Sequence, residues 1–396
     1  MSASRWYGTA GAAIAEWQEQ LINLSHSLHD EPEVAFAEQA SAAKLAELMR
    51  SAGFKVTEGA GDLPTALTAV HGEGELTIGV CAEYDALPEI GHGCGHNIIC
   101  AIAAGAAIGL RAAADRYGFR VKLIGTPAEE SGGGKQLLLD RGVFDDVTVA
   151  MMAHPGSIDA AGARDSSQAC SRFGVTYRGH PAHAAGAPWD GVNAADAAVV
   201  AQVAIGLLRQ QVPPSSRVAG FIRHGGSVTN IIPELAVLDY EVRAPDADKL
   251  DVLRQRVHDC FRAGALATGA EVSFQQAGPD YLELRNDPWL IGSYGAHLPD
   301  FGRTAVALPP GFNSASTDMG NISHVIPSMH PMIGLRGATA TAHTREFAVS
   351  ARSAAADEAA IDGANLLARV GIDLARDAGR RAGYVALRAS HRSAPD

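Results

Sequence analysis

One short stretch of the chain gathers side chains that could bind a metal. Cys94 and His96 flank a single glycine, and Glu83 and Asp85 precede them with one residue between. A thiolate and an imidazole beside carboxylates are a ligand set that transition metals favour. Cysteine beside glycine is also common in packed cores, so the pair alone leaves both a metal site and a core position open.

Further ligand types occur later in the chain. Glu129 and Glu130 stand side by side before a run of glycines, and His154 and His343 follow in separate segments. Adjacent glutamates can divide the work of a metal site, since one can bind the ion while the other takes a proton from water. Each group alone could equally be a solvated loop or a surface histidine. Their joint occurrence favours a metal site.

Short apolar strands are predicted directly before three of these groups. The predicted strands are 65–70, 76–83, 119–126 and 147–154, and a helix is predicted over 98–116 after His96. Strands alternating with helices predict an α/β layer architecture. Open α/β sheets bind ligands beyond the carboxyl ends of their strands, which is where these side chains would lie.

The middle of the chain follows a different pattern. Strands are predicted at 170–180, 217–224, 235–244 and 271–276, with helices at 193–212 and 246–269. The order β-α-β-β-α-β is that of a ferredoxin-like sandwich. We therefore expect an inserted domain at 169–277 within a discontinuous domain formed by 1–168 and 278–396. The final fifteen or so residues, rich in Arg and Ala, are predicted to be a tail or a frayed helix.

Composition narrows the classes of protein. A chain of 396 residues favours two domains, and a net charge of −12 argues against nucleic acid as a partner. The five cysteines lack the pairing of a secreted disulfide scaffold. We found no leader-like start and no window of eighteen uninterrupted apolar residues, so we expect a cytoplasmic protein that neither binds nor spans a membrane.

Eight segments, in order, resemble those of peptidase family M20, the aminoacylase and carboxypeptidase family of co-catalytic metallopeptidases. They are SLHDEPEVAFAE (27–38), EYDALPEIGHGCGH (83–96), TPAEESGGGK (126–135), MMAHPG (151–156), RGHPAHAAGAPWDGVNAADA (178–197), GGSVTNIIPE (225–234), STDMGNISHVIPSMHP (316–331) and AHTREF (342–347). Within the family the chain resembles the amidohydrolase branch (subfamily D), with aminobenzoyl-glutamate hydrolases and aminoacylase-1-like proteins as relatives. The resemblance implies a catalytic α/β/α sandwich with a mixed central sheet and an inserted ferredoxin-like lid and dimerisation domain.

The resemblance also implies a ligand set for two divalent metal ions in each subunit. Those ligands are Cys94, His96, Glu130, His154 and His343. The thiolate of Cys94 is expected to bridge the two ions. Zinc suits this set first and manganese second, with cobalt and nickel as further candidates.

Other residues take roles from the same resemblance. Glu129 matches a general base, Asp85 an acid that orients a ligand histidine, and His183 a histidine that reaches the active site of the partner subunit in a homodimer. Asn230 matches a position near the substrate. Arg243 is a candidate for binding a substrate carboxylate, with a surface ion pair as its alternative role.

The implied activity is metal-dependent hydrolysis of the amide bond in a small N-acyl amino acid or dipeptide. Whether the protein is an N-deacylase or a dipeptidase stays open, and an inactive metal-binding subunit or a thiol enzyme using Cys94 are the alternatives from other classes. Loss of activity with a chelator would separate metal catalysis from thiol catalysis. Glu83 stands where the branch usually has Asp, and we assign it no role from the sequence.

Overall fold

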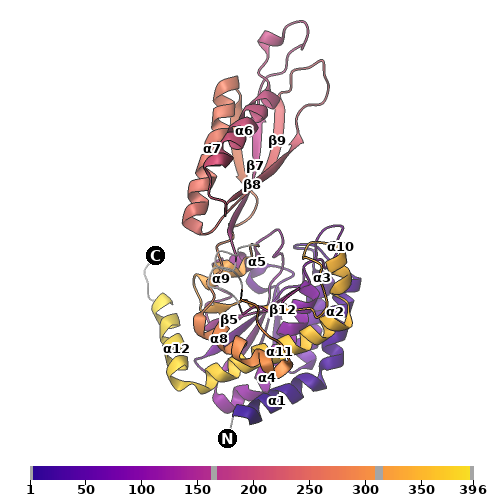
Figure 1. The fold of residues 1–396 in the computed structure, drawn as a ribbon, viewed down its shortest axis with the longest axis vertical. Coiled ribbons are helices and arrows are strands. Elements are labelled where there is room, and N and C mark those ends of the chain that lie inside the picture. Colours follow the sequence, from indigo (N-terminus) through magenta and orange to yellow (C-terminus); the bar gives the residue numbers. More distant parts are fainter. Residues whose placement is uncertain (1–2, 162–166, 308–314, 393–396) are drawn as a thin grey trace. The chain divides into compact units, whose positions relative to one another are not determined.

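The computed structural model describes residues 3–161, 167–307 and 315–392. The described chain divides into two compact units (Figure 1). One holds Ser167–Glu283 with residues 315–316, and the other holds the described residues on either side. The inserted segment is thus a little longer at both ends than the 169–277 predicted from the sequence.

The first unit is built on a six-stranded mixed sheet. In spatial order its strands are β1 (Lys55–Glu58), β2 (Leu67–Gly72), β4 (Arg120–Gly125), β3 (Thr77–Ala82), β5 (Val149–Met151) and β11 (Ser328–Met329). The strands from β4 to β11 run parallel, whereas β1 and β2 pair antiparallel. A separate parallel pair joins β6 (His154–Gly156) and β12 (Met332–Gly334). The carboxyl ends of β3, β4 and β5 therefore meet at one edge of the sheet.

Helices cover both faces of this sheet. The α-helices of the unit are α1 (Ala3–Glu16), α2 (Gln18–Asp30), α3 (Gln39–Ser51), α4 (His96–Tyr117), α5 (Gly134–Asp140), α8 (Pro288–His297), α9 (Met319–Ser323), α10 (Arg345–Ser350), α11 (Ala354–Arg376) and α12 (Ala378–Arg392). Ile78 and Val80 pack in the cluster that includes α4 and α11, whereas Cys81 and Ile124 pack in the cluster with α5 and α9. The result is the expected α/β/α sandwich.

Helix α4 is the core helix of this unit. It is long and apolar enough to cross a membrane by composition, but 89% of that apolar window is buried within the structure. Its small residues allow close packing against α11, since a Cβ on Gly105 would lie 2.7 Å from the Cβ of Ala364. The apolar character of α4 is thus accounted for by its place in the core.

The C-terminal segment corrects one prediction. Instead of a tail or a frayed helix, the described part of it forms α12, which is docked on the first unit. Arg381 donates to the carbonyl of Tyr117 at 2.6 Å, Arg388 donates to the carbonyl of Asp146 at 2.8 Å, and Tyr384 is buried. Arginines that bond to backbone carbonyls look the same in composition as arginines that face water, and this is why the sequence misled.

The second unit has the predicted ferredoxin-like order. Its elements are β7 (Ala169–Arg178), α6 (Ala194–Leu208), β8 (Arg217–His224), β9 (Leu235–Ala244), α7 (Ala247–Thr268) and β10 (Glu271–Gln276). The four strands form an antiparallel sheet in the order β10-β7-β9-β8. Both helices contribute to a single core with the sheet, through residues such as Ala201, Phe261 and Tyr240. Figure 1 labels both helices and the strands β7, β8 and β9 of this unit. Among the described residues, strand β8 pairs only with β9 and so forms one edge of this sheet.

Candidate metal centre

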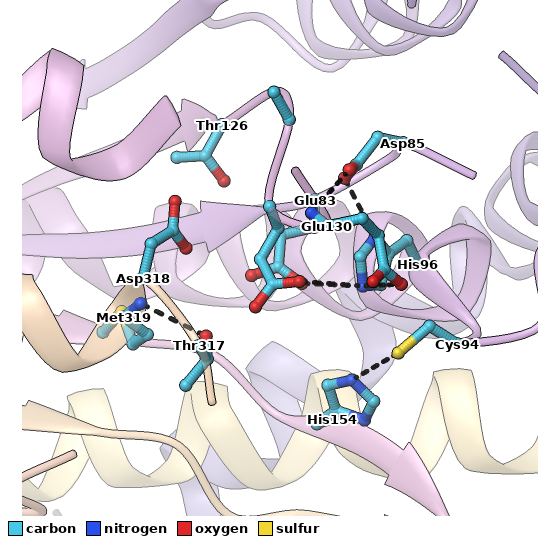
Figure 2. Close-up of polar contacts among 12 residues, drawn as sticks. Glu83, Asp85, Cys94, His96, Thr126, Glu130, His154, Thr317, Asp318 and Met319 are labelled. Carbon is cyan, nitrogen blue, oxygen red and sulfur yellow. Dashed lines mark hydrogen bonds and ion pairs between the residues drawn. The ribbon is translucent and has the colours of Figure 1, made fainter. Parts of the chain in front are cut away.

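The sheet of the first unit brings the predicted ligands to one place. Glu83 and Asp85 follow β3, Glu129 and Glu130 follow β4, and His154 lies shortly after β5. Because β3 pairs in parallel with both β4 and β5, the segments after these strands leave the sheet at the same edge. Figure 2 shows the side chains of these segments converging.

A glycine fixes the position of the Cys-X-His pair. Gly95 has φ of 80°, a conformation that glycine adopts without steric cost, and a Cβ there would lie 2.6 Å from the ring of Pro155. This turn places Cys94 before the helix and His96 as the first residue of α4. The Cys94 Sγ atom lies 3.4 Å from Nε2 of His154. Ligand types from two distant segments therefore meet.

Asp85 holds two of the predicted ligands at once. One carboxylate oxygen lies 2.9 Å from Nδ1 of His96, and the other accepts a hydrogen bond from the backbone N–H of Glu130 at 3.0 Å. A proton on Nδ1 leaves the lone pair of Nε2 for another partner. Nε2 of His96 lies 3.9 Å from carboxylate oxygens of both Glu129 and Glu130. This is the pattern of a ligand histidine supported by an acid.

The remaining two histidines face the same centre. His154 Nδ1 lies 2.7 Å from the carbonyl oxygen of Pro155 and must donate to it, so its Nε2 lone pair faces Cys94. His343 has φ of 67°, and its backbone N–H bonds to the carbonyl of Gly93 at 2.8 Å. That contact places Nε2 of His343 3.5 Å from a carboxylate oxygen of Glu130.

Two sets of possible ligands share one cysteine. Cys94, His96 and His154 form one set, and Cys94, Glu130 and His343 form another, with the ligand atoms of each set within 4.8 Å of one another. Among the described residues, Nε2 of His96 is a buried atom with no hydrogen-bond partner. Orphaned buried acceptors beside a thiol and carboxylates fit divalent metal ions.

Electrostatics agree with a cation at this position. Burial raises the pKa of the Cys94 thiol, and Glu130 beside it raises that pKa further. Burial lowers the pKa of His154 to about 4, so this imidazole is neutral near pH 7. A metal ion binds thiolate and neutral imidazole, so loading the site must release the proton of Cys94.

A buried acid shapes the turn that carries the two glutamates. Ala128 has φ of 60°, and its backbone N–H donates to the Glu38 carboxylate at 2.9 Å. Glu38 is fully buried, and its pKa is raised by burial and by the charge of Asp85. Glu129 follows in this turn and is itself 8% exposed. The sequence indicated the paired glutamates but not the acid beneath them.

Two more groups at this centre were not predicted as site residues. Lys135 is fully buried and forms ion pairs with Glu83 and Asp318. The ring of His330 packs edge-on against that of His154, with the centroids 5.6 Å apart. A single lysine shortly before the apolar run LLL (137–139) is a signal that could have revealed Lys135, because a lysine buried in a helix needs an acidic partner.

Three predicted residues belong to the second unit. Backbone hydrogen bonds pair the segments around His183 and Asn230, including Ala184 N–H to the carbonyl of Asn230 at 3.0 Å. Arg243 donates to Glu241 at 2.6 Å and to the hydroxyl of Ser316 at 3.1 Å. Their roles toward the metal centre stay predictions.

Comparison with known proteins identifies the family. A family model described as a peptidase dimerisation domain matches residues 171–268. Over 92% of its length the chain is 38% identical to the Xaa-Arg dipeptidase of Mus musculus, covering 88% of that protein. Over 69% of its length it is 32% identical to a p-aminobenzoyl-glutamate hydrolase chain of Escherichia coli, covering 61% of that protein. The chain belongs to the M20 peptidase family.

Solved structures agree on the fold. A dinuclear metal binding peptidase of the M20 family from Bacillus subtilis matches with a TM-score of 0.68 at 20% identity, over 91% of this chain and 99% of that one. An aminobenzoyl-glutamate utilization protein from Klebsiella pneumoniae matches with a TM-score of 0.67 at 19% identity, over 94% of this chain and 98% of that one. These findings confirm the predicted M20 fold. Family membership, with the similarity to a dipeptidase and to an aminobenzoyl-glutamate hydrolase, confirms the predicted hydrolase of amide bonds.

Proposed function

We propose that this M20 hydrolase is a dipeptidase that uses two divalent metal ions and acts on dipeptides with a C-terminal arginine. The observation that carries the metal chemistry is the convergence of Cys94, His96 and His154 with the Glu129–Glu130 pair. The substrate class rests on 38% identity to an Xaa-Arg dipeptidase over 92% of the chain. The deacylase alternative has support from 28% identity to an N-acetyl-L-cysteine deacetylase over 70% of the chain.

The metal ions are held by the five predicted ligands in this proposal. Cys94, shared by both ligand sets, would contribute to holding both ions; His96 and His154 would complete one set, and Glu130 and His343 the other. Zinc is the first candidate and manganese the second, with cobalt and nickel after them. Bound there, the ions would supply Lewis-acid chemistry, which polarises a substrate carbonyl and lowers the pKa of water.

Glu129 moves the proton in this scheme. It lies next to Glu130 and directs a carboxylate oxygen to within 3.9 Å of Nε2 of His96, and the ligand atoms of these three residues lie within 4.8 Å of one another. Because the five ligands assigned above do not include Glu129, its carboxylate is left for proton transfer. We assign it as the base that takes a proton from the attacking water and returns it to the leaving amine. Asp85 keeps His96 and Glu130 in place through the two hydrogen bonds described above.

His183 is arranged as a hydrogen-bond donor. Its Nδ1 atom accepts from the backbone N–H groups of Ala185 at 3.2 Å and Gly186 at 3.0 Å. Nδ1 therefore carries no proton in the neutral ring, and Nε2 must carry it. We propose that Nε2–H of one subunit donates to the oxyanion that develops on substrate in the partner subunit. Asn230, on the segment paired with the His183 loop, is proposed to contact substrate.

The second unit has a surface suited to homodimer formation. Val199, Val203 and Leu207 follow one another at helical spacing on α6 and are 55%, 59% and 69% exposed. Phe221 on the edge strand β8 is 61% exposed. An edge strand beside an apolar helix face offers backbone hydrogen bonds and apolar surface to a second copy. We therefore propose a homodimer formed through β8 and α6.

A substrate panel tests the proposed activity. The metal-loaded enzyme is offered dipeptides ending in arginine, the matching N-acetyl-arginine, and dipeptides ending in other residues. The proposal expects the highest kcat/KM for the arginine dipeptides, loss of turnover with a chelator, and recovery with zinc or manganese. Preference for the N-acetyl compounds would favour a deacylase instead, and turnover that survives chelation would favour a thiol enzyme.

A subunit-mixing experiment tests the role of His183. Glu129→Ala removes the proposed base, and His183→Ala removes the proposed oxyanion donor. If His183 acts across the interface, a mixed dimer contains one intact site, formed by Glu129 of the His183→Ala subunit and His183 of the Glu129→Ala subunit. Mixing the two inactive proteins is therefore expected to restore part of the activity. Absence of any recovery, with subunit exchange verified by a labelled chain, would contradict the cross-subunit role.

A further inference from the structure

A buried ion-pair cluster lies beside the metal centre. The Lys135 ammonium lies 2.5 Å from Oε1 of Glu83 and 2.6 Å from Oδ1 of Asp318. Oδ2 of Asp318 also accepts the backbone N–H of Lys135 at 2.9 Å. The three side chains are at most 1% exposed. Asp318 thus holds Lys135 at two atoms, and Lys135 in turn holds one oxygen of Glu83.

The Lys135 ammonium already neutralises carboxylate charge in this cluster. Glu83, Glu129 and Asp318 place oxygens within 4.8 Å of one another, a spacing that could also suit a metal ion. Lys135 pairs with two of them and offsets their mutual repulsion. The cluster therefore has its own resident cation, and it leaves the other oxygen of Glu83 for a different partner.

That second oxygen faces the metal centre. Oε2 of Glu83 lies 3.4 Å from Nε2 of His96 (Figure 2). Within the described residues, neither atom has a hydrogen-bond partner, and both are buried. In the neutral form of the ring, with the Nδ1 proton donated to Asp85, Nε2 of His96 is an acceptor that faces another acceptor. Two buried acceptors face to face are unfavourable unless a cation binds both.

We propose that Glu83 is a sixth protein ligand of the metal centre and binds through Oε2 to the ion held by His96. Lys135 and Asp318 are positioning residues that hold the other oxygen of Glu83 and so aim Oε2 at the ion. This inference rests on the proposed two-metal function. It gives a role to Glu83, which the sequence left without one.

Cobalt titration of the chelator-treated protein tests the inference. As Co²⁺ is added, visible absorption follows the d–d bands of each bound ion, and near-ultraviolet absorption follows the thiolate-to-cobalt charge-transfer band of Cys94. Glu83→Gln removes the charge with little change in shape, and we expect one of the two binding steps to weaken at least about tenfold. The d–d bands of that ion should shift, while the thiolate band keeps its amplitude.

Lys135→Met is expected to weaken the same step because Glu83 loses its support. If Lys135 acts through Glu83, Lys135→Met adds no further weakening in the Glu83→Gln background. Lys122→Met is the matched control, since Lys122 is also buried, 8% exposed, and pairs with Asp146 at 2.6 Å. It removes a buried lysine elsewhere in the same unit and should leave both binding steps unchanged.

The outcomes separate this inference from the function on which it rests. Wild-type protein that binds no Co²⁺ would overturn the two-metal function itself. If wild-type protein binds two ions and Glu83→Gln binds them with unchanged affinities and spectra, only the ligand role of Glu83 is overturned. In that case Oε2 of Glu83 accepts a proton of His96 instead of binding an ion. If Glu83→Gln does not fold, Glu83→Asp keeps the charge with a shorter reach, and unchanged affinity in that variant contradicts the inference equally.

Discussion

Replacing Asp85 with asparagine probes how the metal centre is held together. Asp85 accepts two hydrogen bonds, from His96 Nδ1–H at 2.9 Å and from Glu130 N–H at 3.0 Å, one on each carboxylate oxygen. Asparagine has one acceptor oxygen in the same plane, so one of the two donors must then face an N–H₂ group. Asp85→Asn therefore removes the hydrogen bond to either the histidine ligand or the glutamate ligand, while the shape of the side chain at position 85 is almost unchanged.

The expected loss of metal affinity follows from these two hydrogen bonds. Loss of a buried acid that orients a ligand histidine typically lowers metal affinity by about 10- to 100-fold. This corresponds to about 1.4 to 2.7 kcal/mol of binding free energy. Asp85 supports two ligands and is only 1% exposed, so we expect Asp85→Asn to fall toward the upper end of that range.

Calorimetric titration of the chelator-treated protein with zinc or manganese measures this loss. Asp357→Asn is the matched control, because Asp357 Oδ1 lies 2.8 Å from Nε2 of His26 in a partly exposed pair. The control removes an aspartate–histidine contact outside the ligand set and should leave metal affinity unchanged. Wild-type affinity in Asp85→Asn would refute the assignment of Asp85 as the support of His96 and Glu130.

Three further predictions address stability and assembly. Arg303→Met leaves two aspartates without the fully buried cation between them, so unfolding free energy should fall by about 3 to 5 kcal/mol in denaturant titrations. Burial raises the pKa of Glu241, but Arg243 and a second arginine outweigh it and lower that pKa from 4.5 to about 2. An acid whose pKa is lower in the folded than in the unfolded state stabilises the fold at pH values above its unfolded-state pKa. Glu241→Gln should therefore lower the unfolding free energy at neutral pH, and this difference from wild type should vanish as the pH falls from about 4.5 to about 2. Charging the apolar face of α6 with Val203→Glu and Leu207→Glu should shift light-scattering mass toward the monomer, and an unchanged dimer would contradict the proposed interface.

The sequence predicted those parts of the fold that have a strong local pattern. Strands β8, β9 and β10 were placed at their observed bounds because each is a short run of alternating or apolar residues between turn signals. Strand β1, in contrast, consists of the mostly exposed residues KVTE at a sheet edge, where only pairing with β2 indicates a strand. Helix α12 was underestimated because its docking contacts are to backbone carbonyls.

Some residues of the candidate site could be predicted from the sequence, and others could be found only in the fold. The Cys94-X-His96 pair and the adjacent glutamates are visible in the sequence because their members are neighbours. Lys135 is different, because its partners Glu83 and Asp318 lie 52 and 183 residues away. Pairing over such separations depends on the tertiary fold, so no local pattern could have assigned a role to Glu83.

Metal content and turnover of Glu129→Gln test whether Glu129 is the base of a two-metal hydrolase. We expect the variant to keep two divalent ions per chain, because Glu129 is not among the five assigned ligands, and turnover of an arginine dipeptide to fall by about 10²- to 10⁴-fold. Mass spectrometry of the bound metals and steady-state kinetics on the same preparation give both quantities. Wild-type turnover in the presence of both ions would contradict the assignment of Glu129 as the base, and loss of an ion would make Glu129 a ligand instead.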